Sequence, residues 1–258
     1  MSNQNVKAKI LHIDIETAPA LGWVWGKWEQ NVIDFDKYWY ILSFAAKWHK
    51  DNKVIVKGLI DYKEYNKDKE NDKKLVEDIW KLLDEADIVC GHNLDLFDIK
   101  KINARFTYYN IKPPSPYKTV DTLKVARKYF KFDSNKLDDV ARFLNLGQKV
   151  HHTGFELWKG CMKGEKKSWN LMKNYNKNDT LLLEKLYIKL LPWMSGHPNV
   201  GMFKENGIVC PKCGSDKTQS RGYIVNKTTK YKRAQCQNCG GWFKFGPNLR
   251  KEKPAVSI

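Results

Sequence analysis

The sequence predicts an α/β protein in which helices flank a mixed five-stranded sheet, followed by a small cysteine-bearing module. Strand-like segments rich in Ile and Leu come first in a cluster and then alternate with amphipathic helical segments, which is typical of a mixed sheet covered by helices. Four of the six cysteines form two C-x-x-C pairs near the C-terminus. With 258 residues, of which 42% are hydrophobic, the chain can bury a substantial core. This composition excludes wholesale disorder.

The five strands are expected where apolar residues alternate or run continuously between turn-like residues. The first, Ala8 to Ile15, alternates and contains three isoleucines. The other four are expected at residues 38–48, 53–60, 87–91 and 118–120.

The helices are expected where apolar residues recur at helical spacing and where Pro or Gly follows the segment. The stretch Asp61 to Lys74 is rich in both charges and is expected to be a surface loop. The expected helices cover residues 74–85, 96–109, 123–129, 137–144 and 168–190.

Two domains are expected: residues 1–197, and residues 198–258 comprising a linker, the cysteine module and a tail. The net charge of +17 is unevenly spread, with +9 in the last 53 residues and +8 in the first 205. Such a charge favours a polyanionic partner, nucleic acid before an anionic membrane. No apolar run approaches the roughly 20 residues that span a bilayer, and no basic amphipathic helix is evident. No signal peptide precedes the first strand, so a cytoplasmic protein without a membrane partner is expected.

Four acidic residues and a tyrosine stand out by their positions in the predicted strands and helices. Asp14 and Glu16 are two residues apart on the first strand and therefore project from the same face. Asp98 is expected in the first turn of the helix after the fourth strand, with Phe97 packing inward. Tyr175 and Asp179 are spaced i, i+4 on the last helix and face the same space.

Each of these settings also has a purely structural interpretation. Asn93 or Asp95 could cap the helix that follows, Tyr175 could be a core residue, and Asp179 could lie on a solvated face.

Together, the order and spacing of these residues resemble the DEDD-type 3′–5′ exonucleases, in the subclass whose last motif carries a tyrosine. The likeness covers about residues 8–195 and is greatest to the exonuclease domain of family B DNA polymerases and its stand-alone phage-type relatives. It rests also on the segments DIETAP (14–19), VWGKW (24–28), VDTL (120–123) and LDDVARFL (137–144).

The resemblance implies an RNase H-like fold and a two-metal hydrolase that trims single-stranded DNA ends, releasing nucleoside 5′-monophosphates. It implies that two Mg²⁺ or Mn²⁺ ions are held by Asp14, Glu16, Asp98 and Asp179, and that Tyr175 orients the attacking water. Oxygen ligands of this kind suit these ions. The alternatives are an RNA or structure-specific nuclease of the same fold, and a non-catalytic adaptor that binds nucleic acid. The resemblance also places the protein in DNA replication or repair, with a DNA polymerase as a possible partner.

Three further residues are candidates for substrate binding. Asn93 could hold the sugar or a phosphate of the terminal nucleotide, with helix capping as the alternative. Asp121 matches a family position near the site. Trp25, together with Trp23 and Trp28, could stack on unpaired bases, with a hairpin packed on the sheet as the alternative.

The cysteines Cys210, Cys213, Cys236 and Cys239 form two pairs, each followed by Gly, and resemble a zinc ribbon with one structural Zn²⁺. A redox dithiol and an iron–sulfur cluster are the alternatives. Segments between and after the pairs alternate like a hairpin and a third strand. Basic and aromatic residues are interleaved there, among them Lys230, Arg233 and Trp242, which favours nucleic-acid binding over protein docking.

Overall fold

The computed structural model describes residues 7–28, 31–204, 207–252 and 255. The chain divides into two compact units, one formed by Lys9–Leu186 and the other by Tyr187–Ile258 with Met1–Ala8. The domain boundary expected after residue 197 stays a prediction. Within the described ranges, no helix combines the length and the apolar character needed to cross a membrane.

The first unit is built on a mixed sheet of five strands in the order β5-β4-β1-β6-β7, which confirms the predicted fold class. The central strand β1 pairs antiparallel with β4 and parallel with β6, so the direction of the sheet changes at β1. The strands are β1 (Ile10–Thr17), β4 (Ile41–Trp48), β5 (Val54–Gly58), β6 (Ile88–Gly91) and β7 (Lys118–Asp121).

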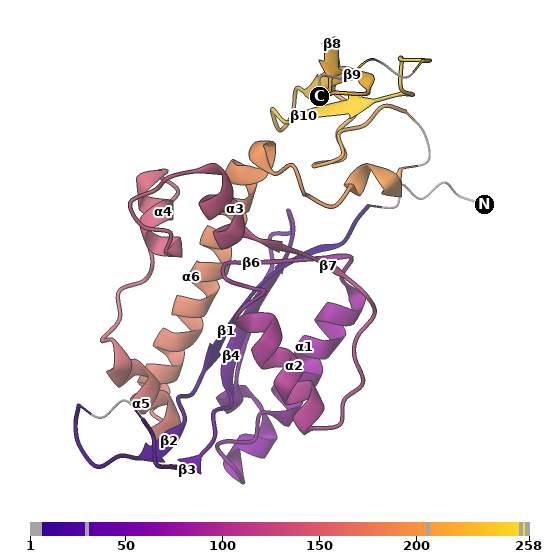
Figure 1. Cartoon of the computed structure of the whole chain (residues 1–258). Helices are drawn as coiled ribbons and strands as arrows, with labels where there is room; N and C mark the ends of the chain where they lie inside the picture. The colour runs from indigo at the N-terminus through magenta and orange to yellow at the C-terminus, as the bar shows by residue number, and fades with distance from the viewer. Residues whose placement is uncertain (1–6, 29–30, 205–206, 253–254, 256–258) are drawn as a thin grey trace. The chain divides into compact units, whose positions relative to one another are not determined.

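Helices cover both faces of this sheet, with α1 and α2 on one side and α6 on the other (Figure 1). Ile13 and Ile15 are almost fully buried in the main apolar core. Because side chains alternate along a strand, Asp14 and Glu16 project from the other face of β1, towards α6. The helices of this unit are α1 (Lys73–Glu85), α2 (Asp98–Tyr108), α3 (Thr122–Tyr129), α4 (Leu137–Phe143), α5 (Phe155–Lys163) and most of α6 (Lys166–Leu190), whose last turn belongs to the second unit.

Most residues of the segment 61–74, which is expected to be a surface loop, are exposed, but Tyr65 and Asp72 are buried. The segment contains the short 3-10 helix Lys63–Asn66 and begins at the last residue of another, Leu59–Asp61. The Asp72 carboxylate is fully buried and accepts hydrogen bonds from Arg105 on α2, from Tyr109 at 2.6 Å and from the Ile41 amide at 2.8 Å. The burial of Asp72 could not be predicted from the charge pattern of the segment, because its partner Arg105 is distant in the sequence.

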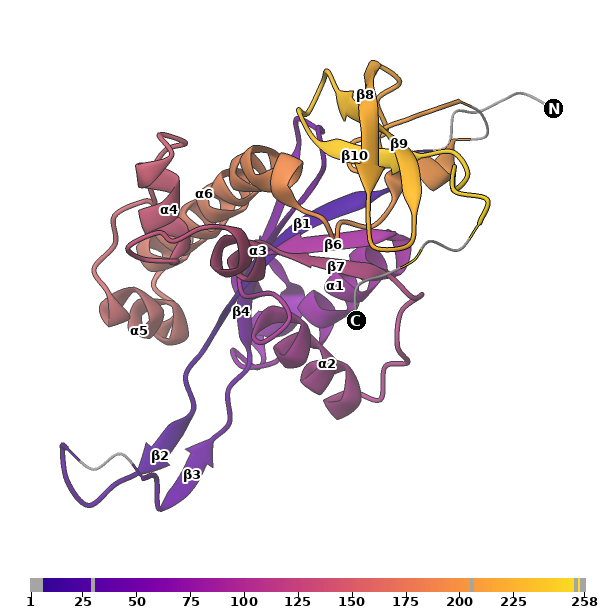
Figure 2. The same cartoon turned by 45° about the horizontal axis from the view of Figure 1, so that its top comes forward.

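The connection after β1 forms a two-stranded ribbon of β2 (Leu21–Trp23) and β3 (Asp34–Lys37), which extends away from the sheet (Figure 2). Trp23, Trp25 and Trp28 are 67%, 88% and 85% exposed. The hairpin packed on the sheet is therefore wrong for these residues, and base stacking by Trp25 stays a prediction. Helix α5 was not predicted from the sequence. Its nine residues lie between Gly154 and Gly164, which both have positive φ and mark the two ends of the helix.

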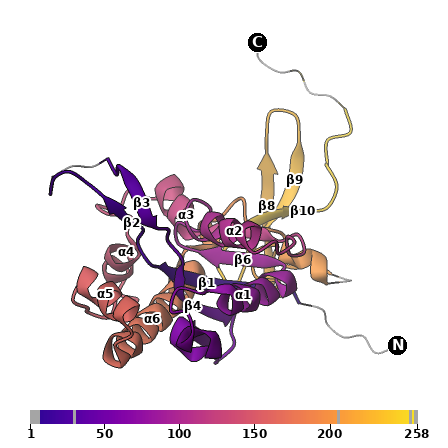
Figure 3. The same cartoon turned by 90° about the horizontal axis from the view of Figure 1, so that it is seen from below.

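The second unit contains an antiparallel sheet in the order β10-β9-β8, with β8 and β9 forming a long hairpin (Figure 3). These strands, β8 (Thr218–Val225), β9 (Lys230–Cys236) and β10 (Trp242–Phe245), confirm the predicted hairpin and third strand. The expected linker contains a short 3-10 helix, Val200–Phe203, which follows another at Leu191–Trp193.

Candidate active site

Three predicted acids meet between β1 and α6. One carboxylate oxygen from each of Asp14, Glu16 and Asp179 lies within 4.8 Å of the others. The fourth acid, Asp98, opens α2, and its Oδ1 accepts a hydrogen bond of 3.1 Å from the Ile15 amide. This hydrogen bond holds Asp98 against β1, at the residue between Asp14 and Glu16. Asp98 is not one of the three acids whose oxygens lie within 4.8 Å of one another.

The turn between β6 and α2 differs from the expectation. Phe97 is 37% exposed, and the residue that packs inward is Leu94. Asn93 adopts a left-handed backbone conformation with φ of 67°, and the N-cap position is Phe97, so neither Asn93 nor Asp95 caps α2. The Asp95 carboxylate instead pairs with Lys124 at 2.6 Å.

Burial without enough positive charge raises the pKa of the acids. Burial, with the nearby Asp179 charge, raises the pKa of Asp14 to about 7. Burial and then the Asp14 charge raise the pKa of both Glu16 and Asp98 well above their usual range. Within the described residues, the buried Oδ1 of Asp179 has no hydrogen-bond donor. Buried, mutually repelling carboxylates with an unpartnered oxygen suit a divalent cation.

Two polar residues complete this cluster and were missed from the sequence. Lys149 donates hydrogen bonds from Nζ to Asp179 Oδ2 at 2.5 Å and to the Tyr175 hydroxyl at 3.0 Å. Asn176 donates from Nδ2 to Asp14 Oδ2 at 2.5 Å and to the Asp14 carbonyl at 3.2 Å. The shared contact of Lys149 shows that Tyr175 and Asp179 face the same space. Asn176 could have been predicted from the sequence, because it is next to Tyr175 on the same predicted helix. Lys149 could not, because its loop shows no regular pattern.

A polar groove opens beside Asp14. Its volume is about 470 Å³, and the positive side chains of Arg127, Lys136 and Lys149 line it together with Asn93. Three cations around a groove that reaches a carboxylate cluster provide positions for the phosphates of a polyanion.

An apolar groove of about 550 Å³ begins at Thr17, one residue beyond Glu16. Trp39, Phe155 and Trp158 line it, with Lys101 at its edge. The Trp158 ring stands edge-on to the Tyr175 ring, 6.2 Å between centroids. Aromatic side chains therefore lie next to the acids on this side, where an unpaired base could stack.

Comparison with known protein families agrees with this geometry. A family model described as the RNase H superfamily matches residues 39–191, more than half of the chain. The chain belongs to the RNase H superfamily. A comparison with curated protein sequences gives no match.

Among solved structures, this RNase H superfamily chain is similar to a family B DNA polymerase from the hyperthermophilic archaeon Pyrobaculum calidifontis. The TM-score is 0.54 and the sequence identity 16%, and the likeness covers 72% of this chain. It spans only 25% of the polymerase chain. At this identity the likeness shows the fold.

The family match contains Asp98, Tyr175 and Asp179 but begins after β1. Asp14 and Glu16 therefore lie outside the matched residues. The tertiary structure places both beside Asp179, and so joins the part of the chain before the match to the part within it.

Asp121 holds the turn that carries Asn93. Its Oδ1 accepts hydrogen bonds from the amides of Asn93 at 3.0 Å and Leu123 at 2.9 Å, and its Oδ2 from the amide of Asp95 at 3.3 Å. Asp121 is also the N-cap of α3. The Asp121 carboxylate therefore fixes the backbone of the turn that carries Asn93.

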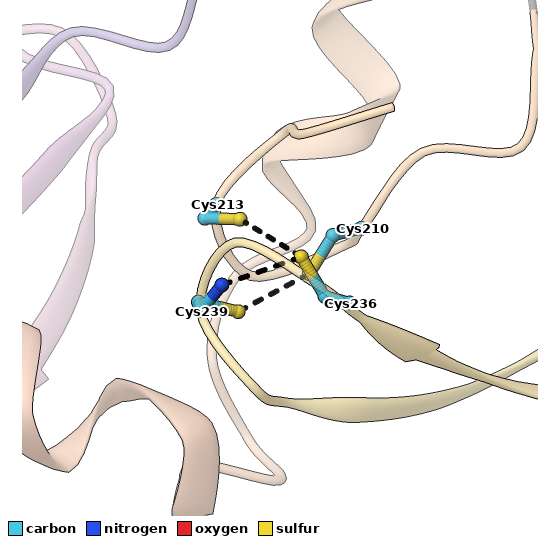
Figure 4. Close-up of side chains that lie close together, drawn as sticks. All are labelled: Cys210, Cys213, Cys236 and Cys239. Atoms are coloured by element: carbon cyan, nitrogen blue, oxygen red, sulfur yellow. Dashed lines mark hydrogen bonds between the residues drawn. The ribbon is translucent and has the colours of Figure 1, made fainter. Parts of the chain in front are cut away.

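The four predicted cysteines meet in the second unit (Figure 4). The sulfur atoms of Cys210 and Cys239 are 3.6 Å apart, as are those of Cys213 and Cys236. Tetrahedral zinc with sulfur ligands at about 2.3 Å requires sulfurs about 3.8 Å apart. The four-cysteine cluster therefore has the geometry of a zinc site.

The other predicted residues of this unit lie on two strands. Lys230 and Arg233 are on β9, and Trp242 is on β10. The Arg233 guanidinium is 5.2 Å from the centre of the Trp242 ring, whereas the Lys230 ammonium is 4.5 Å from the ring of Tyr223.

A third group of metal-ligand types, His12, His49 and Glu184, was not anticipated. His12 Nε2 is 3.2 Å from His49 Nδ1, which is 3.3 Å from Glu184 Oε1. The other oxygen of Glu184 pairs with Lys47 at 2.5 Å. Lys47 already neutralises the charge of the Glu184 carboxylate. We therefore interpret this group as a chain of polar contacts that joins β1, β4 and α6, and not as a metal site.

Proposed function

We propose that this chain is a metal-dependent 3′–5′ exonuclease that hydrolyses phosphodiester bonds at single-stranded DNA ends and releases nucleoside 5′-monophosphates. The observation that carries the proposal is the meeting of Asp14, Glu16 and Asp179 within 4.8 Å beside a cation-lined groove. A divalent cation supplies Lewis-acid stabilisation of the phosphate and activation of a water there. Membership of the RNase H superfamily supports a nuclease.

In this proposal Asp14, Glu16, Asp98 and Asp179 hold two Mg²⁺ or Mn²⁺ ions. Burial and the Asp179 charge hold the pKa of Tyr175 above its ordinary value, so its hydroxyl keeps its proton and orients the attacking water. Lys149 contacts both Tyr175 and Asp179. We propose that its ammonium contacts the scissile phosphate. Asn176 fixes the Asp14 carboxylate in place.

We further propose one structural Zn²⁺ on the four cysteines, with the basic strands beside it assisting nucleic-acid binding. DNA is proposed as the substrate because the structural neighbour is a DNA polymerase. The setting we propose is replication or repair in the cytoplasm, alongside a polymerase partner.

The test uses 5′-labelled single-stranded DNA and RNA of one sequence, with Mg²⁺ or Mn²⁺. The wild type is compared with Asp14→Ala and with a control, Asp51→Ala, which removes an exposed carboxylate in the turn after β4. A ladder that shortens from the 3′ end, is lost in Asp14→Ala and persists in Asp51→Ala is the expected result.

Other outcomes separate the alternatives. Shortening of RNA alone would identify a ribonuclease of the same fold. Internal cuts would indicate a structure-specific nuclease. Intact substrate bound equally by wild type and Asp14→Ala would overturn the enzyme and favour a non-catalytic adaptor.

A further inference from the structure

The small sheet of the second unit presents two different faces. Tyr231, Arg233 and Gln235 alternate along β9 and therefore share one face. Across the ladder, Gln235 is opposite Trp242, and Arg233 is opposite Lys244. None of these five side chains is buried.

Cations stand over both aromatic rings of this face. The Arg233 guanidinium is 5.2 Å and that of Arg221 6.0 Å from the Trp242 ring centre, and the Lys244 ammonium is 4.2 Å from that of Tyr231. Arg233 Nε also donates a 2.7 Å hydrogen bond to the Arg221 carbonyl, which fixes its position. Trp242 is 45% exposed. We call Arg221, Tyr231, Arg233, Trp242 and Lys244 the aromatic–basic face.

The opposite face is closed over part of its length. It carries Ala234 and Cys236, which are buried beside the cysteine cluster. Towards the hairpin end it exposes Lys232, paired across the ladder with Tyr223. Among the described residues of these strands, the aromatic–basic face is the one that carries no buried side chain.

We propose that the aromatic–basic face binds single-stranded nucleic acid, with unpaired bases stacking on Trp242 and Tyr231 while the three cations contact phosphates. The partner must be single-stranded, because the faces of paired bases are covered by their neighbours in a duplex. Residues 206–258 hold eleven Lys or Arg and two Asp or Glu, which suits a polyanion. The proposal deepens the proposed function and rests on nucleic acid being its substrate.

Two matched pairs of variants test this face in the full-length chain. Trp242→Ala is compared with Tyr223→Ala, an exposed ring on the opposite face. Arg233→Ala is compared with Lys232→Ala, which removes the same charge from the neighbouring residue. All four are made in the Asp14→Ala background to prevent cleavage, and titrated with fluorescently labelled oligo(dT), oligo(U) and a duplex. Zinc content and circular dichroism verify that each variant is folded.

Trp242→Ala is expected to weaken binding of both single strands about 10-fold, because one stacked base is lost. Arg233→Ala is expected to lower the slope of log affinity against log salt by about 0.7, the value for one phosphate contact on a single strand. Tyr223→Ala and Lys232→Ala are expected to leave both quantities near the parent values.

If the two variants of each pair change the affinity equally, the proposed binding face is contradicted and general electrostatic attraction is indicated. No effect from Trp242→Ala and Arg233→Ala would also overturn it and favour docking of a protein. The test is independent of catalysis: a chain that binds as expected but fails to cut DNA or RNA refutes the nuclease alone. A chain that cuts but shows no difference within the pairs refutes the face alone.

Discussion

Lys149 provides positive charge where the buried acids need it. Its ammonium contacts Asp179 and the Tyr175 hydroxyl, and these contacts raise the pKa of Lys149 although burial alone would lower it. The residue thus remains charged at the edge of the groove that reaches Asp14. A fixed cation beside a reacting phosphate stabilises developing negative charge.

Replacing Lys149 is therefore expected to slow cleavage. Lys149→Ala should reduce the rate about 100-fold, and Lys149→Arg should recover part of it, because the positive charge returns with a different shape. Single-turnover cleavage of labelled single-stranded DNA measures both. Lys124→Ala, which removes an exposed lysine paired with Asp95, is the control. A rate unchanged in Lys149→Ala would contradict the placement of this lysine at the phosphate.

Asp14 makes the stability of the folded chain fall as the pH rises, whereas most carboxylates in folded proteins make it rise. The pKa of Asp14 is about 7 in the folded chain, above its value of 3.8 in an exposed setting. Between these values the folded state binds more protons than the unfolded state, so stability falls as pH rises from about 4 to 7. Above pH 7 the full cost of the ionised Asp14 is present.

Asp14→Asn removes this cost. Without added Mg²⁺ or Mn²⁺, the variant should be more stable than the wild type by about 1–3 kcal/mol at pH 8. The gain should disappear as the pH falls towards 4. Urea unfolding at both pH values measures it. A stability difference independent of pH would show that Asp14 is ionised freely in the folded chain.

At the scale of elements, the Asp72 carboxylate joins the segment before α1 to α2 and to the start of β4. It is fully buried and faces Arg105, whose side chain is 10% exposed. An ion pair with hydrogen bonds on both partners holds these elements in one arrangement, and Asp98 is on the same helix as Arg105. The position of one acid of the site thus depends on this contact.

Asp72→Ala is expected to lower the free energy of unfolding by about 3–5 kcal/mol, because the Arg105 charge remains buried without its partner. Chemical denaturation measures the loss. Asp68→Ala, an exposed acid in the same segment, should change stability by less than about 0.5 kcal/mol. A small effect of Asp72→Ala would mean that Arg105 reaches solvent after the substitution.

At the scale of the whole molecule, two compact units are stabilised by different means. The first unit has an extensive apolar core on both faces of its five-stranded sheet. The described core residues of the second unit are few, and its four cysteines lie together. A unit of this size needs a metal or disulfides to remain folded.

Cys213→Ser is therefore expected to lose zinc and unfold the second unit while the first remains folded. Limited proteolysis should then cut within residues 207–252 and leave a fragment containing Lys9–Leu186. Elemental analysis should find about one Zn²⁺ per wild-type chain. Cys161→Ser, at a buried cysteine of the first unit, should leave the zinc content unchanged. Retention of zinc by Cys213→Ser would refute the four-cysteine zinc site.

Local pattern alone determined much of this protein. The alternation of β1 placed Asp14 and Glu16 on one face, the i, i+4 spacing placed Tyr175 with Asp179, and the two C-x-x-C pairs predicted the cysteine cluster. Each depends on strand or helix periodicity or on a short turn, so neighbouring residues in the sequence suffice. The order of helices and strands likewise predicted a mixed five-stranded sheet, which the observed strand order confirms.

Only the tertiary structure decided which distant residues meet. Lys149 reaches Tyr175 and Asp179 from a loop with no regular pattern, and the buried pair of Asp72 and Arg105 joins residues 33 apart. The pairing register of β9 and β10 places Gln235 opposite Trp242 and Arg233 opposite Lys244, and so brings residues of two strands together on one face of the small sheet. Charge and composition do not predict these contacts. Burial and strand register arise from packing between segments that are distant in the sequence.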